Sequence, residues 1–347
     1  MEYYGTLGKA CDDKKILREM FGYGMTGVRL NLAHQSLNEA SLEIGRVFKA
    51  AEDEGIKPDL LIDLQGPELR VGEIKKSMQL SEGKKVHLGS GKGDIPVPQT
   101  VMDLLFPGRE ILIDDGRIKL HTEKVSEKDL DDGPHIVSAV CEVVRGGTLA
   151  SRKNIMIPDQ DANMPTLTKQ DKNQLRLVKQ YGVTGVMQSF VRGAGDIQLL
   201  KEELHKNDAD DVRIFAKIES RSGYEHIGEI AAGCDMVVIA RGDLGSSFPL
   251  WELPRIQKEI AQVCNNLGKP FMVVTQLLHS MEKHAIPTRA EVSDIYNAVL
   301  DGASALMLTG ETAIGQYPVR SMRFLTKTAK TACMTNDPHI KELLDLP

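Results

Sequence analysis

The chain lacks long hydrophobic runs, paired cysteines and basic blocks, and each absence excludes a class of protein. No stretch of the 347 residues approaches the roughly 18 apolar residues of a membrane span. The five cysteines show no CxxC spacing, so neither a disulfide framework nor a zinc site is expected. The formal net charge is -6 and no block of five basic residues occurs, which argues against a nucleic acid or an anionic membrane as the main partner.

The first residues, MEYYGTLGKACDDKK, also lack the basic and then apolar pattern of a leader peptide. We therefore expect a cytoplasmic protein. Hydrophobic residues make up 41% and charged residues 27% of the chain, which is the balance of an ordinary soluble globular protein. The length fits one large α/β unit that carries an insertion.

The chain does contain a regular alternation of short apolar runs and amphipathic helical segments, which is typical of an α/β barrel. The pattern predicts helices over residues 14–23, 37–54, 167–182, 196–204, 224–232, 250–266, 288–300 and 318–332. It predicts strands over residues 3–6, 27–32, 59–63, 185–187, 213–216, 236–240, 271–274 and 305–308. Eight strands is the number that a closed (β/α)₈ barrel, or TIM barrel, requires.

The alternation is interrupted after the third strand. Residues 71–158 are rich in Gly, Lys, Pro and short β-branched runs with turn signals between them, which predicts an inserted small all-β domain. We expect barrel segments over residues 1–70 and 159–335, and a short tail over 336–347. Because the insertion follows a strand on the side where a barrel binds its substrates, it is expected to act as a mobile lid.

Two acidic residues follow consecutive strands of the predicted barrel. Glu219 and Asp243 come after the fifth and sixth strands, where α/β barrels place their catalytic groups. Two carboxylates with room for waters and a substrate oxygen suit Mg²⁺ or Mn²⁺. Alternatively, each acid caps the following helix or pairs with a neighbouring arginine, Arg221 or Arg241.

Three basic residues near strand ends are suited to phosphate. Lys217 stands two residues before Glu219 and shares its face of the strand, whereas Arg29 and Arg70 stand near the ends of the second and third strands. The alternatives are that Lys217 extends outward to solvent and that the arginines pair with Asp63 or Glu68.

Two further polar residues follow strands. The hydroxyl of Thr275 could relay a proton, although such threonines often cap the next helix. His34 could contact a nucleotide phosphate or act as a structural hydrogen-bonding group.

Long motifs are spread over residues 5–334. In chain order they are VRLNLAH (28–34), IDLQGPELR (62–70), PTLTKQD (165–171), QSFVR (188–192), KIES (217–220), ARGDLG (240–245), VVTQLLHSM (273–281), PTRAEVSD (287–294) and NAVLDGASALMLTGETA (297–313). These motifs, in this order, resemble those of the pyruvate kinase family. The resemblance implies a barrel with a β-rich lid, and transfer of a phosphoryl group from phosphoenolpyruvate to ADP, giving pyruvate and ATP.

The resemblance also implies roles for single residues. Lys217 would steady the phosphoryl group, Glu219 and Asp243 would hold Mg²⁺, and Thr275 would aid protonation of the enolate. By matched position, the backbone of Ala240, Arg241 and Gly242 would bind the substrate carboxylate. Arg29, Arg70 and Ser189 would form the phosphate pocket, and Asn31 and His34 would contact the nucleotide. Arg152 or Lys153 would reach the phosphates, and Asp115 would be the acid of the lid.

The sequence departs from the family pattern near its start. The segment GTLGKA differs from the usual one, which affects the nucleotide contacts near Thr6 and Lys9. Ala33 and Leu64 replace two potassium ligands of the potassium-dependent members, which leaves Asn31 and Asp63 as a degenerate site. We therefore do not expect a potassium requirement, although members that work without potassium usually carry lysine at the position of Glu68.

The chain stops where the regulatory domain of the family would begin, so control by a sugar phosphate at that domain is not expected. Because family members pair their barrels, a homodimer is expected. Two alternatives to the kinase remain. One is a degenerate relative that senses phosphoenolpyruvate without turnover, and the other is a different barrel enzyme acting on phosphoenolpyruvate or an oxo acid, such as a lyase.

Overall fold

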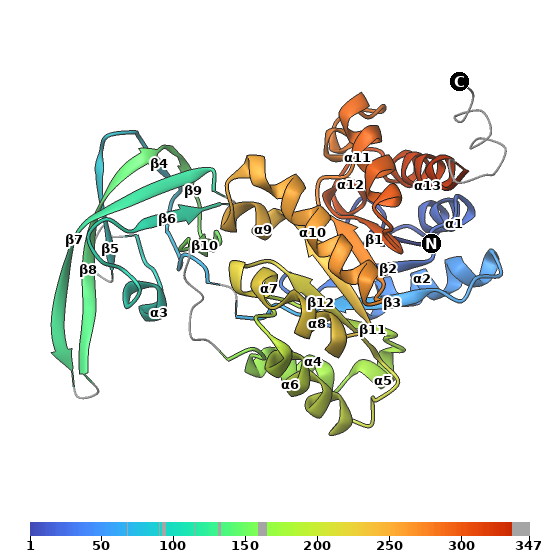
Figure 1. Cartoon of the computed structure of the whole chain (residues 1–347), viewed down its shortest axis with the longest axis horizontal. Helices are drawn as coiled ribbons and strands as arrows, with labels where there is room; N and C mark the ends of the chain where they lie inside the picture. Colours follow the sequence, from blue (N-terminus) through green and yellow to red (C-terminus); the bar gives the residue numbers. More distant parts are fainter. Residues whose placement is uncertain are drawn as a thin grey trace. The chain divides into compact units, whose positions relative to one another are not determined.

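The computed structural model describes residues 1–67, 69–89, 91, 95–114, 116–130, 133–158 and 165–334. Within it the chain forms two compact units, each of which is drawn in Figure 1. Unit 1 comprises Met1–Gly66, Thr166–Arg241 and Glu252–Pro347, and unit 2 comprises Pro67–Pro165 and Gly242–Trp251.

Unit 1 is a closed barrel whose described strands are all parallel to their neighbours and follow the order β1-β15-β14-β13-β12-β11-β3-β2. The strands are β1 (Glu2–Thr6), β2 (Gly27–Asn31), β3 (Asp59–Asp63), β11 (Gly185–Gln188), β12 (Arg213–Ile218), β13 (Met236–Ala240), β14 (Phe271–Val274) and β15 (Ala305–Leu308). The predicted TIM barrel is thereby confirmed, with each strand close to its predicted position.

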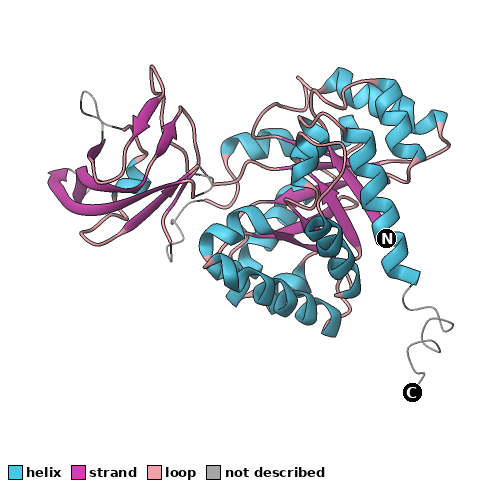
Figure 2. Cartoon of the chain, turned by 90° about the horizontal axis from the view of Figure 1, so that it is seen from above, coloured by secondary structure: helices cyan, strands magenta, loops and turns pink. Residues whose placement is uncertain are grey.

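Helices surround the strands of unit 1, as the view from above shows (Figure 2). They are α1 (Lys14–Gly22), α2 (Ser41–Asp53), α4 (Lys169–Leu175), α5 (Val178–Tyr181), α6 (Ala194–His205), α7 (Arg221–Glu225), α8 (Ile227–Gly233), α10 (Leu253–Asn266), α11 (Arg289–Leu300), α12 (Gly310–Ala313), α13 (Pro318–Met334) and the 3₁₀ turn η2 (His279–Glu282). Capping boxes begin α4 at Thr168 and α11 at Thr288, with Asp171 and Glu291 as the reciprocal partners.

Three predicted helices differ from the structure in their continuity. The segment 167–182 is divided between α4 and α5. The segment 224–232 is divided between α7 and α8, because the backbone at His226 (φ -102°, ψ 19°) leaves the helical region. The segment 250–266 begins as the 3₁₀ turn η1 (Leu250–Glu252), and α10 starts at Leu253 with proline in its first turn.

The interior of the barrel is apolar. It is filled by the side chains of Tyr4, Leu61, Met187, Phe215, Met236, Val238, Ala240, Met272, Val274, Ala305 and Met307. Because side chains alternate between the two faces of a strand, the residue two positions after an interior residue points to the same side. Lys217, Asp63 and Ser189 follow Phe215, Leu61 and Met187 at this spacing, so the strand period places polar groups directly above the apolar core.

Unit 2 is built mainly of antiparallel strands that follow β3 in the chain. Its described strands form a sheet in the order β10-β6-β7-β8-β5 and a separate pair, β4-β9. The elements are β4 (Met78–Leu80), β5 (Lys85–Gly89), β6 (Glu110–Ile113), β7 (Ile118–Leu130), β8 (Gly133–Arg145), β9 (Gly147–Leu149), β10 (Ile155–Met156) and α3 (Gln99–Met102), and α9 (Arg241–Ser247) continues into this unit from β13. A separate apolar cluster that includes Leu88, Ile111 and Val143 stabilises it.

In the part of the chain that the structure describes, no helix is both long enough and apolar enough to cross a membrane.

Gly185 offers a test of the barrel packing. A Cβ atom there would approach Phe215 Cε2 at 2.5 Å and Leu61 Cδ2 at 2.6 Å, both inside the barrel. We expect Gly185→Ala to lower the free energy of unfolding in urea by about 1–3 kcal/mol, because the core would be overpacked. Gly45 in α2 has nothing within 4 Å of the equivalent position, and Gly45→Ala should stabilise by about 0.5–1 kcal/mol. Equal effects at both positions would contradict the packing described here.

Candidate active site

Lys217 lies at the centre of a buried polar cluster at the C-terminal end of the barrel strands. Its side chain is 12% exposed, and Nζ lies 2.9 Å from Glu219 Oε1 and 3.2 Å from Asp63 Oδ1. Nζ also donates to the hydroxyl of Ser189 at 3.0 Å. The alternative in which Lys217 extends outward to solvent is therefore wrong.

Asp63 connects Lys217 to a second cation. Its Oδ2 accepts from Arg29 Nε at 2.9 Å and Nη2 at 2.5 Å, while its Oδ1 faces Lys217 and Ser189. The Ser189 hydroxyl can also donate to the carbonyl of Leu64 at 2.8 Å. The salt bridge between Arg29 and Asp63, which the sequence offered as an alternative to phosphate binding, is present.

The charges in this cluster keep Asp63 and Lys217 ionised. Burial alone would raise the pKa of the Asp63 carboxyl, but Lys217 and Arg29 outweigh burial and hold that pKa below its usual value. Burial alone would lower the pKa of Lys217, but the carboxylates of Asp63 and Glu219 raise it above its usual value. A protonated lysine is therefore maintained at neutral pH, at a position where water is largely excluded.

Glu219 is buried, with 2% of its side chain exposed, and each of its oxygens has a defined neighbour. Oε1 faces Lys217, and Oε2 accepts the backbone N–H of Phe190 at 2.9 Å. Phe190 adopts a left-handed backbone conformation with φ 53°, which is uncommon for a residue other than glycine. The loop after β11 is thus shaped so that its backbone holds the carboxylate.

Thr275 follows the last residue of β14 and also has a left-handed backbone. Its φ is 74°, and the next residue, Gln276, has φ 57°. A β-branched residue is rarely found in this region, and such strain concentrates at functional sites. The side chain of Arg241 donates to the carbonyl of Thr275, with Nη2 at 2.8 Å and Nε at 3.2 Å. Arg241 Nη1 also pairs with the carboxylate of Asp294 at 2.8 Å.

The residues predicted to contact the nucleotide lie at the end of β2. Asn31 ends that strand, and its Oδ1 accepts the backbone N–H of Ala33 at 3.1 Å. His34 lies in the turn that follows, where its own N–H donates to the carbonyl of Asn31. Ala240, the first residue of the predicted carboxylate cradle, ends β13.

The other predicted site residues belong to unit 2 and are described within it. Arg70 donates to the carbonyl of Arg152 at 2.8 Å, and Lys153 pairs with Asp114 at 2.6 Å. Gly242 and Asp243 lie in α9. Asp115 lies outside the described residues. Among those that are described, no group of three or more His, Cys, Asp or Glu side chains is arranged to hold a metal ion.

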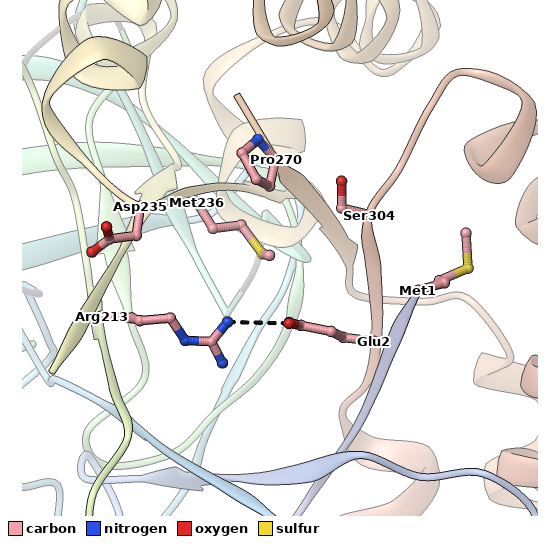
Figure 3. A pocket seen from close by; sticks show the side chains of 7 residues that line it. All are labelled: Met1, Glu2, Arg213, Asp235, Met236, Pro270 and Ser304. Atoms are coloured by element: carbon pink, nitrogen blue, oxygen red, sulfur yellow. Dashed lines mark hydrogen bonds and ion pairs between the residues drawn. The ribbon is translucent and has the colours of Figure 1, made fainter. Parts of the chain in front are cut away.

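A pocket of about 470 Å³ lies at the opposite end of the barrel, where the strands begin (Figure 3). Arg213 points into it and pairs with Glu2 at 3.1 Å, and it also pairs with Asp59 at 2.7 Å. Barrel enzymes place their chemistry at the C-terminal ends of the strands, so this pocket is not the active site.

Sequence reasoning missed three contributors to the site: the backbone N–H of Phe190, the side chain of Arg241, and Asp294. Asp294 lies within the motif PTRAEVSD, so a signal was present for that residue. No sequence pattern marks the left-handed backbone at Phe190, because glycine or asparagine would be the usual sign of it.

Comparison with known proteins finds matches over most of this chain. The family model described as the pyruvate kinase barrel domain matches residues 2–322. Proteins named pyruvate kinase are 38% identical over 333 residues (Thermococcus litoralis), 36% over 328 (Aeropyrum pernix) and 35% over 332 (Geobacillus stearothermophilus). These alignments cover 94%, 94% and 93% of this chain, but 68%, 69% and 55% of the respective relatives. The chain thus spans between about half and about two thirds of the length of these relatives.

The ion cluster should make a large and pH-independent contribution to stability near neutrality. We expect Asp63→Asn to lower the free energy of unfolding by about 3–5 kcal/mol, because two buried cations lose their shared counter-charge. The contribution of Asp63 is present above its usual pKa of 3.8 and disappears only as pH falls through its lower folded pKa. The contribution of Lys217 is present below its usual pKa of 10.5 and is lost as pH rises through its higher folded pKa.

The difference between wild type and Asp63→Asn should therefore stay constant between about pH 6 and pH 9 when measured by urea unfolding. Asp12→Asn serves as the control, because Asp12 pairs with Arg46 at a more exposed position and should contribute about 1 kcal/mol or less. A difference that changes strongly within this pH window would contradict the assignment of charges.

Proposed function

Because the chain belongs to the pyruvate kinase family, we propose that it transfers the phosphoryl group of phosphoenolpyruvate to ADP, with uptake of one proton, to give pyruvate and ATP. The observation that carries this proposal is the buried cluster around Lys217, in which the lysine ammonium stays protonated at the C-terminal end of the barrel strands.

Lys217 and Arg29 are proposed to balance the charge of the phosphoryl group during transfer. Both are buried or nearly so, and both are held in place by Asp63 before any substrate binds. Preorganised charges in a site with little water stabilise a transition state more strongly than mobile surface charges do. Ser189 and Arg70 are proposed to complete the phosphate pocket.

Glu219 and Asp243 are proposed to hold Mg²⁺ or Mn²⁺. Carboxylate oxygens are the ligands that these cations prefer. The strand register supports the pair, because Ile218 of β12 pairs with Ile239 of β13 and Glu219 is therefore level with Ala240. Asp243 follows three residues later in α9. A bound divalent ion would supply positive charge to the oxygens of the transferred group.

The remaining roles follow the family resemblance. The hydroxyl of Thr275 is proposed to aid protonation of the enolate, and the backbone amides of Ala240, Arg241 and Gly242 to bind the substrate carboxylate. Asn31, His34 and Lys153 are proposed to bind the nucleotide. Unit 2 is proposed to act as a lid that carries Asp115. We also propose a cytoplasmic homodimer.

The enzyme is proposed not to require potassium at the degenerate site formed by Asn31 and Asp63. The Asn31 amide oxygen accepts a backbone N–H, and both oxygens of Asp63 face cationic side chains. Asp63 thus has its charge balanced by Arg29 and Lys217. Ala33 and Leu64 offer no side-chain oxygen to a monovalent ion.

A coupled assay tests the kinase proposal. Pyruvate should form from phosphoenolpyruvate only when both ADP and Mg²⁺ are present, and Lys217→Ala should lower kcat by at least about 10²-fold, because the charge opposite the phosphoryl oxygens is lost. Lys269→Ala is the control, because Lys269 bonds to the carbonyl of Cys234 away from the cluster. Phosphoenolpyruvate binding without turnover would favour the sensor, and ADP-independent product formation would favour a lyase.

Replacing sodium by potassium tests the second part of the proposal. We expect kcat in 100 mM NaCl and in 100 mM KCl to agree within about twofold, because the charge of Asp63 is already balanced by two side chains. Choline chloride at the same concentration controls for ionic strength. Stimulation by potassium of about tenfold or more would show that a monovalent site persists despite Ala33 and Leu64.

A further inference from the structure

The backbone turn at Thr275 must be held by its surroundings. Thr275 and Gln276 both have positive φ, 74° and 57°, directly after β14 ends at Val274. Conformations of this kind are strained for residues other than glycine and persist only where neighbouring groups impose them. Neither residue is glycine, so the sequence itself does not favour the turn.

Arg241 holds the start of this turn. Its guanidinium donates two hydrogen bonds to the carbonyl of Thr275, from Nη2 at 2.8 Å and from Nε at 3.2 Å, and Nε also lies 3.3 Å from the carbonyl of Val274. The Arg241 side chain is only 12% exposed. A planar guanidinium bound in this way fixes the direction of the Thr275 peptide group, which a single flexible donor cannot do.

Asp294 in turn orients the guanidinium. Arg241 Nη1 lies 2.8 Å from the carboxylate of Asp294 in α11 and 3.4 Å from Gln257 Oε1 in α10. The far end of the turn is also fixed, because the buried carboxylate of Glu311 accepts the backbone N–H groups of Leu278 at 3.0 Å and Thr309 at 2.8 Å. Thr275 and Gln276 therefore lie between two fixed points of unit 1, one held by the side chain of Arg241 and the other by the carboxylate of Glu311.

We propose that Arg241, oriented by Asp294, is a positioning residue for Thr275. This inference rests on the proposed function, in which the hydroxyl of Thr275 gives its proton to the methylene carbon of the enolate. A C–H bond forms as the O–H bond breaks, and the hydroxyl regains a proton from solvent. Arg241 and Asp294 hold the hydroxyl in the geometry that this proton transfer needs.

The experiment compares Asp294→Ala and Asp294→Asn with wild type. Asparagine keeps an oxygen that can accept from Arg241, whereas alanine keeps none. We expect kcat to fall in the order wild type, Asp294→Asn, Asp294→Ala, by up to about 10²-fold, while the KM for phosphoenolpyruvate changes less than about twofold. Because proton transfer becomes limiting, the ratio of kcat in H₂O to kcat in D₂O should rise in the same order.

A second readout isolates the proton step. Exchange of pyruvate methyl protons with D₂O, followed by NMR in the presence of enzyme and Mg²⁺, should slow in the same order as kcat. Asp59→Asn is the matched control, because Asp59 pairs with Arg213 at 2.7 Å at the other end of the barrel. It should leave the solvent isotope effect and the exchange rate unchanged.

The two proposals fail in different ways. If wild type makes no pyruvate, the proposed function and the proton-transfer role of Thr275 fail together, and crystal structures of wild type and Asp294→Ala then decide whether Asp294 and Arg241 position Thr275. The positioning role stands if the φ of Thr275 leaves the left-handed region in the variant, and it is overturned if that φ is unchanged. With an active wild type, an Asp294→Ala variant whose isotope effect and exchange rate match wild type would overturn it.

Discussion

The C-terminal end of the barrel strands depends on one buried arrangement of charges, in which Asp63 is shared by Arg29 and Lys217 while Lys217 also faces Glu219. Buried ions are tolerated only when they are paired, and removing one member leaves the others uncompensated. The strands supply the pairing of Asp63, Arg29 and Lys217, because these residues lie in β3, β2 and β12 of one closed sheet, whereas Glu219 follows the end of β12. The same closure that stabilises the fold therefore assembles the cluster.

The barrel fold and the position of Lys217 above the apolar core could be predicted, because both follow from the short-range periodicity of the sequence. Alternation along β12 places Phe215 in the core and Lys217 above it, and the apolar runs mark each strand. What the sequence does not indicate depends on contacts between distant segments. The left-handed backbone at Phe190 and the pairing of Arg241 with Asp294 are imposed by tertiary packing, against the local preference of the residues concerned.

A structural interpretation and a functional one can hold for the same residue. Arg29 forms the salt bridge with Asp63 that the sequence suggested as an alternative to phosphate binding, and this pairing is what keeps the guanidinium in one place. A side chain that must face a phosphate without reorganising benefits from a fixed partner on its other side. The same reasoning applies to Lys217, whose two carboxylate neighbours raise its pKa and secure its charge.

The barrel interior beneath the cluster is notable for its methionines, which are Met187, Met236, Met272 and Met307. Their thioether side chains are unbranched and polarizable, so they fill irregular space by changing rotamer at little cost. The barrel therefore combines an adaptable interior with a rim whose geometry is set by charge pairs. Where methionines line the core, part of a volume change can be absorbed by a change of rotamer, whereas the rim residues are held by charge pairs that tolerate little displacement.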